Sequence, residues 1–426
     1  MHKPQHATPQ SRIKSMINKL NVIFRKVRQG KRLPSSNDCV KVIYFVSDHR
    51  GSLQNPNSGG SQAGSHRVNY MLNIIADHFS KNDIYCVSTA SWKNSRIFRA
   101  IERPNDSYDN VTEVYLGQID LGPFRYISST FSAMIWLITH LDDGDILITY
   151  NFTPPTALFA WFTMLLRKYK LIIEFEELYG LIGTSRYKKL FLVSENYGVN
   201  KSSGFITCSE EIAKRIRCSR GPTSPIAISS GYFGSLTFPT ARCRNGNRLC
   251  VLYSGTLDDE RGVRRLIDTM VDLKDIADLT ITGTGPLRDY IVKRTRLCEN
   301  IRYLGNLSED MYQQTLAEAD VCINPTPKGT AFSQHSFPSK VTYYLSHSKI
   351  VLSTKLDVIQ SSPYNNMVIY YDDTTPNGLR EALIYIQDHL EQLSEKSEMF
   401  PEEIANIRKE ERSDLCNLFK YVCNGN

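Results

Sequence analysis

The stretch LTITGTGPLRDY, residues 279–290, carries the pattern that decides the fold. Residues 279–282 form a short run of apolar and β-branched side chains, which favours a buried strand. Gly283 and Gly285 then allow a tight turn and the close approach of a phosphate to the backbone. The third glycine of a dinucleotide fingerprint is missing, because position 288 is arginine. The pattern therefore predicts a strand, a turn and a helix of a parallel sheet, with either a nucleotide site or an ordinary turn at the glycines.

The same alternation of apolar runs and helical patterns extends over both halves of the chain. The predicted strands are residues 41–47, 84–88, 112–115, 146–150, 171–175 and 204–207 in the first half, and 249–254, 279–282, 301–304, 321–324 and 350–353 in the second. Most of these strands have no polar alternation, which is typical of a parallel sheet covered by helices on both faces. We therefore expect an α/β fold with two Rossmann-like doubly wound domains facing a central cleft.

A segment rich in Gly, Pro, Ser and Thr, residues 219–247, interrupts this alternation and indicates a linker. The expected organisation is an N-terminal arm over 1–38, a first Rossmann-like domain with the linker over 39–243, a second Rossmann-like domain over 244–400, and a C-terminal helix over 401–426.

Composition and charge exclude several classes of protein. Hydrophobic residues make up 41% and charged residues 22%, which is ordinary for a globular protein and excludes wholesale disorder. The net charge of +7 is concentrated in the first 40 residues, which hold nine basic side chains and one acidic one, so the body is close to neutral and nucleic acid is not an expected partner. The ten cysteines form no CxxC pair, so we expect reduced thiols and no zinc site. No apolar run is long enough to span a membrane, and no signal-peptide pattern is expected.

The basic arm has a helical pattern of its own over residues 12–28 (RIKSMINKLNVIFRKVR). Apolar residues recur there at spacings of three and four, while the cations lie mostly off this stripe. Such a helix can lie in a membrane interface with its cations near anionic headgroups. The alternatives are a terminal helix docked on the body and a disordered leader.

Two clusters in the second half suit an anion. Gly255 and Thr256 follow a predicted strand, and Arg261 stands near the start of the next helix, where a guanidinium suits a diphosphate or simply caps the helix. Pro338 suits the first turn of another helix, which would leave the backbone N–H groups of Ser339 and Lys340 available.

The order and spacing of four segments carry a resemblance to a known family. The segments are YSGTLDDERGVRRLIDTM from residue 253, LTITGTGPL from 279, NIRYLGNLSEDMYQQTLAEADVCINPT from 300 and FPSKVTYYLSHSKIVLST from 337. Together they resemble the C-terminal domain of GT-B glycosyltransferases, specifically the large family of retaining enzymes called family four, or group 1. The resemblance covers about residues 248–355 and extends more loosely over 41–235.

This resemblance implies that the second domain binds a nucleotide-sugar donor and the first domain an acceptor. Arg261, Lys340 and His335 stand at the implied catalytic positions. The implied donor-binding positions are Gly59, Gly60, Gly255, Thr256, Gly283, Gly285, Tyr303, Gly305, Leu307, Pro338, Ser339 and Tyr343. Three positions depart from the family pattern: Tyr343 replaces the glutamate that bonds the ribose, His335 replaces a second glutamate, and Thr256 replaces an arginine. A phenol cannot accept two hydroxyl hydrogen bonds as a carboxylate can.

The expected acceptor-binding residues follow two predicted strands of the first domain. Tyr150 and Asn151 end one strand, and Glu174 and Glu177 belong to an acidic cluster at the end of the next, where Glu174 and Glu176 share a face. These acids suit acceptor hydroxyls or a base, or they form a solvated strand end. The Asp143-Gly144-Asp145 triplet precedes its strand, so we interpret it as a turn at the wrong end of the sheet for a metal site.

The sequence therefore predicts a metal-independent retaining glycosyltransferase whose nucleotide-sugar is a co-substrate, with no other cofactor. Its acceptor is expected to be a saccharide or a lipid-linked precursor of surface polysaccharide or glycolipid, and its place the cytoplasm or the inner face of the membrane. Two alternatives stay open: a nucleotide-sugar epimerase, and a non-catalytic protein that binds sugar nucleotides or assists assembly.

Overall fold

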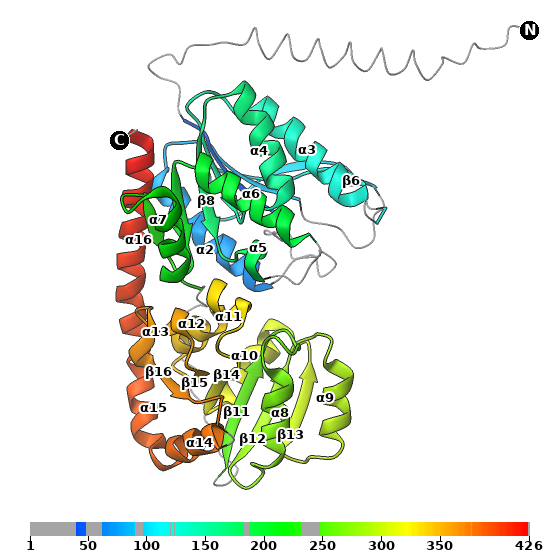
Figure 1. Ribbon diagram of the computed structural model, residues 1–426, viewed down its shortest axis with the longest axis vertical. Helices are drawn as coiled ribbons and strands as arrows, with labels where there is room; N and C mark the ends of the chain where they lie inside the picture. Colours follow the sequence, from blue (N-terminus) through cyan, green and yellow to red (C-terminus); the bar gives the residue numbers. More distant parts are fainter. Residues whose placement is uncertain are drawn as a thin grey trace, which may run out of the picture.

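The computed structural model describes residues 40–47, 62–89, 97–119, 121–122, 124–182, 187–231, 248–375 and 377–424. The predicted arm over 1–38 and the predicted donor glycines Gly59 and Gly60 lie outside the described residues. Figure 1 shows two α/β domains one above the other, with the C-terminal helix running along both.

The first domain is built on an eight-stranded sheet of order β10-β9-β8-β7-β1-β2-β5-β4. All neighbours pair in parallel except β4, an antiparallel edge strand that the sequence did not predict. The strands are β1 (Val42–Val46), β2 (Ile84–Ser88), β4 (Ile101–Pro104), β5 (Val111–Tyr115), β7 (Ile146–Tyr150), β8 (Lys170–Phe175), β9 (Gly204–Thr207) and β10 (Ile226–Ile228). Two further short strands, β3 (Ile97–Phe98) and β6 (Gln118–Ile119), pair with each other.

Helices cover both faces of this sheet because its strands are apolar on both sides. Along β1, Ile43 and Phe45 join one core while Val42, Tyr44 and Val46 join another. The first core packs under α3 (Phe124–His140) and α4 (Pro154–Leu166), with α6 (Lys188–Lys201) beside α4. The second packs under α2 (Gln62–His78). The short α5 (Tyr179–Ile182) and α7 (Glu210–Arg220) complete the domain.

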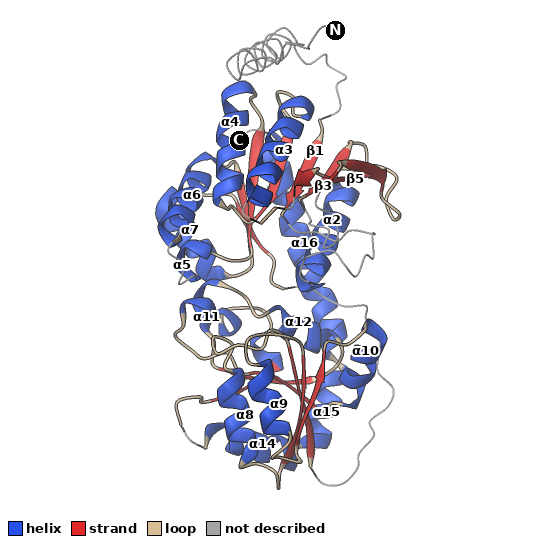
Figure 2. Ribbon diagram, turned by 90° about the vertical axis from the view of Figure 1, so that its right-hand side faces the viewer, coloured by secondary structure: helices blue, strands red, loops and turns tan. Residues whose placement is uncertain are grey.

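The second domain has a six-stranded, wholly parallel sheet of order β13-β12-β11-β14-β15-β16. Its strands are β11 (Leu249–Ser254), β12 (Ala277–Thr282), β13 (Ile301–Gly305), β14 (Val321–Asn324), β15 (Ile350–Thr354) and β16 (Val368–Tyr371). The other elements are α8 (Val263–Val271), α9 (Arg288–Thr295), α10 (Glu309–Glu318), α11 (Ala331–His335), α12 (Ser339–Ser346), α13 (Asp357–Gln360), η1 (Asn365–Met367), α14 (Gly378–Asp388) and α15 (Leu390–Glu398). The predicted strands of both halves are thus confirmed, and Figure 2 shows helices on both sides of each sheet.

The last helix, α16 (Phe400–Asn424), begins against the second domain and ends in the core of the first. Phe400 and Ile404 join a cluster that includes residues of α12, whereas Leu418 and Phe419 join the core under β1. A Cβ atom on Gly204 of β9 would lie 2.9 Å from the Cδ1 atom of Leu418, so glycine at this position lets the helix pack closely on the strand.

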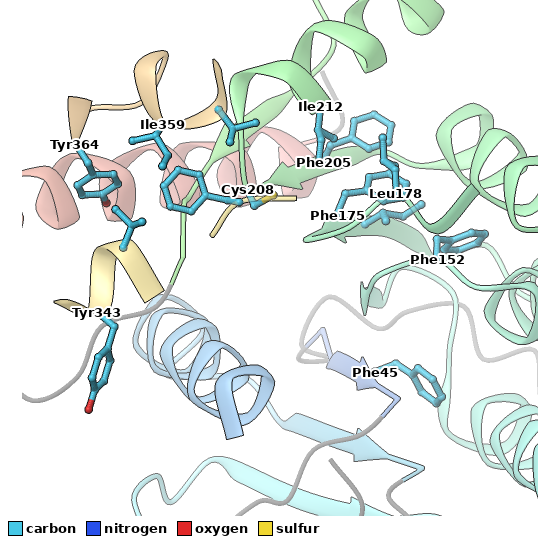
Figure 3. Close-up of a cluster of buried hydrophobic side chains, with 14 of the residues drawn as sticks. Phe45, Phe152, Phe175, Leu178, Phe205, Cys208, Ile212, Tyr343, Ile359 and Tyr364 are labelled. Carbon is cyan, nitrogen blue, oxygen red and sulfur yellow. The ribbon is translucent and has the colours of Figure 1, made fainter. Parts of the chain in front are cut away.

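A hydrophobic cluster also continues from one domain into the other, as Figure 3 shows. Phe205 and Cys208 come from the first domain, and Ile359 and Tyr364 from the second. The two domains therefore share buried apolar surface beside the region where their sheets face each other.

Candidate functional site

A cavity of about 650 Å³ lies between the carboxyl ends of the two sheets. In each sheet the chain reverses its direction of winding at one point, between β1 and β7 in the first domain and between β11 and β14 in the second. Loops that leave strands at such a switch point diverge and leave a crevice, which is where open α/β sheets bind ligands. Residues after all four of these strands line the cavity: Ser47, Asn151, Gly255 and Thr326.

Lys340, in the first turn of α12, lies in the wall that the second domain contributes. Its ammonium lies 4.9 Å from the centroid of the Tyr312 ring and 5.4 Å from that of Tyr343. Burial lowers the pKa of Lys340 to about 8, although Glu309 opposes the shift. Within the described part of the chain this ammonium has no hydrogen-bond acceptor, so it is a desolvated cation that an anionic ligand would stabilise.

Arg261 lines the same wall in the loop before α8. Its guanidinium pairs with Asp258 and lies 4.4 Å from the centroid of the Phe332 ring. The next residue, Gly262, has φ 72°, and a Cβ atom there would lie 2.0 Å from the carbonyl oxygen of Pro325. Only glycine permits this contact, so the Arg-Gly pair fixes the loop against the segment after β14 and holds Arg261 at the cavity.

Two glycine turns meet at the carboxyl edge of the second sheet. Gly283 has φ 121°, and a Cβ atom there would lie 1.9 Å from the carbonyl oxygen of Gly255. The hydroxyl of Tyr303 donates a hydrogen bond to the carbonyl of Gly283 at 2.9 Å, and the backbone N–H of Gly283 donates to the carbonyl of Gly305 at 2.8 Å. Gly255 and Gly283 line the cavity, whereas Tyr303, Gly305 and Gly285 support these turns from behind.

A carboxylate stands beside Tyr343, the position where the resemblance led us to expect one. Gln313 donates a hydrogen bond to the Tyr343 hydroxyl at 2.6 Å and to Glu309 at 2.9 Å, and the Tyr343 hydroxyl lies 3.5 Å from the same glutamate oxygen. Glu309, at the start of α10, lines the cavity with Tyr343. The phenol thus helps to orient a carboxylate that comes from another helix.

The first domain contributes an acidic wall. Asn151, held in the left-handed region with φ 57°, accepts hydrogen bonds through its side-chain oxygen from the backbone N–H groups of Glu176 and Glu177, at 2.9 and 3.1 Å. Asparagine tolerates this backbone conformation better than most residues. Both glutamates line the cavity, and burial raises both pKa values, that of Glu176 to about 8.

A buried ion-pair network supports this wall from behind. The Nε atom of Arg67 lies 2.8 Å from Glu174 and 2.9 Å from Glu176, and Tyr44 donates a hydrogen bond to Glu174 at 2.5 Å. The predicted shared face of Glu174 and Glu176 is therefore confirmed. Glu174 is fully buried and does not line the cavity, whereas Arg67 does.

The structure brings most of the predicted site residues to one cavity. The residues that line it are Arg261, Lys340, Gly255, Thr256, Gly283, Leu307, Pro338, Ser339, Tyr343, Tyr150, Asn151 and Glu177. His335 lies outside this lining at the end of α11, where its carbonyl accepts a hydrogen bond from the backbone N–H of Leu178, at 3.4 Å. Burial lowers the pKa of His335.

Three lining residues with a carboxylate, imidazole or guanidinium group were not predicted: His66, Arg67 and Glu309. His66 and Arg67 belong to the first turns of α2, the helix that follows β1 at the switch point. The general rule for switch points could have found them, but the apolar pattern of the sequence indicates a helix only over residues 68–79, after both. No sequence pattern indicates Glu309 as a site residue, because its contact with Tyr343 forms only in the folded protein.

The Asp143-Gly144-Asp145 triplet lies at the opposite end of the first sheet from the cavity, as its position before β7 predicted. Asp145 accepts a hydrogen bond from the backbone N–H of Lys41 at 2.9 Å, and Asp143 accepts one from the backbone N–H of Lys168 at 2.8 Å. No group of three potential metal ligands occurs within the described ranges. None of the helices in these ranges is long and apolar enough to cross a membrane.

Two Rossmann-like domains with a cavity between their carboxyl edges define the GT-B fold, and solved structures confirm this class. Sucrose-phosphate synthase from Thermosynechococcus elongatus superposes with a TM-score of 0.69 at 13% identity, covering 91% of this chain and 100% of that one. The catalytic domain of starch synthase IV from Arabidopsis thaliana, bound to ADP and acarbose, gives 0.61 at 11% identity, with coverages of 91% and 100%. The lipopolysaccharide outer core galactosyltransferase WaaB gives 0.54 at 13% identity, with coverages of 89% and 99%.

No protein-family model matches the sequence, and no curated protein matches it by sequence. The similarity therefore lies in the fold.

Proposed function

We propose that the protein is a glycosyltransferase that moves a sugar from a nucleotide-sugar donor to a saccharide or lipid-linked acceptor with retention, as in the family-four enzymes. The observation that carries the proposal is the partly buried Lys340 ammonium at a helix start, with Arg261 in the same cavity wall. Both cations face the region where the fold places ligands. The proposed pathway is the synthesis of surface polysaccharide or glycolipid.

The proposed reaction separates charge in a way that suits this wall. The bond between the anomeric carbon and the diphosphate oxygen breaks, and the electron pair stays on the diphosphate. The acceptor oxygen forms the new bond on the same face of the sugar, and its proton passes to the departing diphosphate oxygen. Negative charge therefore grows on the diphosphate, where Lys340, Arg261 and the N–H groups at the start of α12 are placed to stabilise it. These groups would make a divalent metal unnecessary.

The acidic wall suits the acceptor. Glu176 pairs with Arg67 and also lines the cavity, so its carboxylate can accept hydrogen bonds from acceptor hydroxyls. Glu177 and the hydroxyls of Tyr150 and Tyr179 line the same side. Such a set of donors and acceptors suits the hydroxyl groups of a saccharide.

Glu309 is the proposed partner of the donor's vicinal hydroxyls. A carboxylate can accept hydrogen bonds from two adjacent hydroxyls, and this one is oriented by Gln313 and Tyr343 at the edge of the cavity. The chain would thereby replace, from α10, the carboxylate that Tyr343 cannot supply.

The decisive experiment is a thermal-shift panel of UDP-, GDP- and ADP-sugars, followed by donor hydrolysis in the absence of acceptor. We expect one nucleotide to raise the melting temperature and its sugar to be released slowly to water. If no member of the panel changed the melting temperature, the proposed donor site would be contradicted. Stabilisation without hydrolysis or transfer would instead support the non-catalytic binding protein, which the replacement of the expected glutamate by Tyr343 favours.

The proposed place of action is the cytoplasmic side of the membrane, with the basic arm as a peripheral contact. Deleting residues 1–36 should leave the melting temperature unchanged and move the protein from the membrane to the soluble fraction, because the arm carries the positive charge of the chain. Full-length protein that does not bind anionic vesicles at low salt would contradict this role of the arm.

A further inference from the structure

Three neighbouring helices of the first domain expose apolar stripes on the side that faces away from the core. On α3 the exposed residues Phe124, Ile127, Phe131 and Ile135 recur at spacings of three and four, and Leu158, Trp161 and Leu165 do the same on α4. Leu190 and Val193 continue the stripe on α6, which contacts α4. We call these nine residues the outer face.

The density of exposed apolar side chains on these helices is unusual for a soluble surface. Ten of the 22 exposed large hydrophobic residues within the described ranges lie on α3, α4 and α6. The exposed fractions of Phe124 and Leu165 are 64% and 65%. The inner sides of α3 and α4 are apolar as well, because Leu137 and Phe159 belong to the core. Helices that are apolar on both sides normally bury both of them.

The charges around the outer face have one sign. The three helices carry four cations, Arg125, Lys188, Lys189 and Lys201. Helix α4 carries no charged residue, and the only acid on the three helices, Glu195, is 4% exposed and accepts a hydrogen bond from the backbone N–H of Gly180. An approaching partner therefore meets apolar and aromatic side chains together with positive charge.

We propose that the outer face binds the surface of an anionic lipid bilayer. Aromatic and aliphatic side chains can enter the boundary between headgroups and acyl chains while lysine and arginine remain at the phosphates. A second copy of the chain fits less well, because two such faces would bring like charges together with no exposed acid on these helices to pair them. The proposal concerns folded residues and is separate from the basic arm.

One of the helices of the outer face begins near the acceptor half of the cavity. Helix α4 begins at Pro154, three residues after Asn151 in the cavity wall. The opposite end of the molecule, at the donor-side domain, presents only scattered exposed apolar residues within the described ranges, such as Leu297. Binding through the outer face would keep the acceptor side of the cavity near the bilayer and the donor side in water.

The test is co-sedimentation of the full chain with vesicles at low salt, without donor, so that its outcome does not depend on transfer activity. One set of vesicles is phosphatidylcholine alone, and the other contains equal amounts of phosphatidylcholine and phosphatidylglycerol. To remove the positive charge of the arm, all nine of its basic residues are replaced by glutamine in a full-length background: Lys3, Arg12, Lys14, Lys19, Arg25, Lys26, Arg28, Lys31 and Arg32. This background should still bind the anionic vesicles, and its binding should weaken as salt is added.

Within that background, the pairs Phe131→Glu with Ile135→Glu and Trp161→Glu with Leu165→Glu should each reduce vesicle binding about tenfold or more. Lys188→Glu with Lys189→Glu should abolish the preference for anionic lipid. The matched control is Leu297→Glu, at a residue 76% exposed in the second domain, which should bind like the background. All six substituted positions on α3, α4 and α6 are exposed, so melting temperatures should change little.

Two results would overturn the proposal. The first is an arm-neutralised protein that fails to bind anionic vesicles while remaining folded. The second is a self-associating protein whose dimer, measured by light scattering, is dissociated by the same glutamate pairs while vesicle binding is unchanged, since this would assign the outer face to a second copy of the chain.

Discussion

The two walls of the cavity have opposite electrostatic character. The wall from the second domain presents Lys340, Arg261 and backbone N–H groups, whereas the wall from the first domain presents Glu176 and Glu177. A reaction that leaves negative charge on one fragment and removes a proton from the other needs such a division. This division supports the proposed placement of the donor against the second domain and of the acceptor against the first.

The walls also differ in how they are held. The cationic wall is made by short turns at strand ends, with Gly262 and Gly283 fitting backbone against backbone. The acidic wall rests on Arg67, which joins Glu174 and Glu176 and donates a hydrogen bond to Ser229 at 2.9 Å. Glu411 of α16 reaches the same Ser229, at 3.3 Å. We therefore expect substitutions on the cationic wall to affect catalysis first, and substitutions behind the acidic wall to affect folding as well.

The largest expected effect is that of Lys340→Met. The variant keeps the volume of the side chain but removes the charge nearest the start of α12, and kcat should fall by about three orders of magnitude, or roughly 4 kcal/mol. The measurement is single-turnover transfer with the donor identified by the thermal-shift panel. A rate within a few-fold of the wild-type rate would contradict the proposal that the Lys340 charge stabilises the leaving diphosphate.

The same variant should be more stable than wild type at neutral pH. The pKa of Lys340 is about 8 in the folded protein and 10.5 for the free side chain, so the unfolded state binds more protons between these values. The burial cost of the charge is therefore fully present below pH 8 and disappears as the pH rises toward 10.5. Melting temperatures of the two proteins should converge over this range, and donor kcat/KM of the wild type should decline above about pH 8.

The next largest effect is that of Arg261→Ala, which should lower kcat by about two orders of magnitude, roughly 3 kcal/mol, more than it raises the KM for the donor. Arg261→Lys should recover only part of the loss, since an ammonium cannot make the two parallel hydrogen bonds that a guanidinium makes to one phosphate. The matched control is Arg264→Ala, because Arg264 pairs with Asp259 on the exposed side of α8. Normal turnover by a folded Arg261→Ala protein would remove this arginine from the site.

A smaller effect is expected for Glu309→Gln, which should raise the KM for the donor about tenfold and change kcat less, because the hydrogen bonds to the vicinal hydroxyls form in the ground state. Glu318→Gln provides the control on the same helix, since Glu318 pairs with Arg302 at the surface. Equal donor KM values for the two variants would contradict the proposed role of Glu309.

The smallest expected effect is that of chelation. Transfer in excess EDTA should equal transfer in buffer, since cationic side chains and helix N–H groups are proposed to stabilise the leaving diphosphate. Steady-state rates with and without added manganese provide the measurement. Activity that is lost in EDTA and restored by manganese would contradict the proposal that the cationic wall stabilises the leaving diphosphate without a metal ion.

The sequence predicted the two sheets well because their strands are continuous apolar runs, and such runs need no knowledge of distant partners. It missed β4, β10 and β16, which are edge strands, because runs of three or four residues are too short to show a strand pattern. The direction of β4, antiparallel to β5, also has no local signal.

The candidate site divides in the same way. Residues in turns directly after strands, such as Gly255 and Asn151, could be placed from the sequence because parallel strands end at one edge. Glu309 could not, since it reaches the cavity through its contact with Tyr343 across two helices. The position of His335 also escaped the sequence argument, because a motif position specifies a distance along the chain and not the orientation of a short helix.

The path of α16 has a consequence for the order in which the protein folds. Leu415, Leu418 and Phe419 fill the core against β1, yet a ribosome makes them after both domains have been synthesised. One face of the first sheet therefore stays uncovered by this helix throughout translation, and the first domain cannot complete its core before the second has emerged. A nascent chain that ends before α16 would expose that apolar face and need a chaperone. In the finished chain, the single helix α16 packs against both domains.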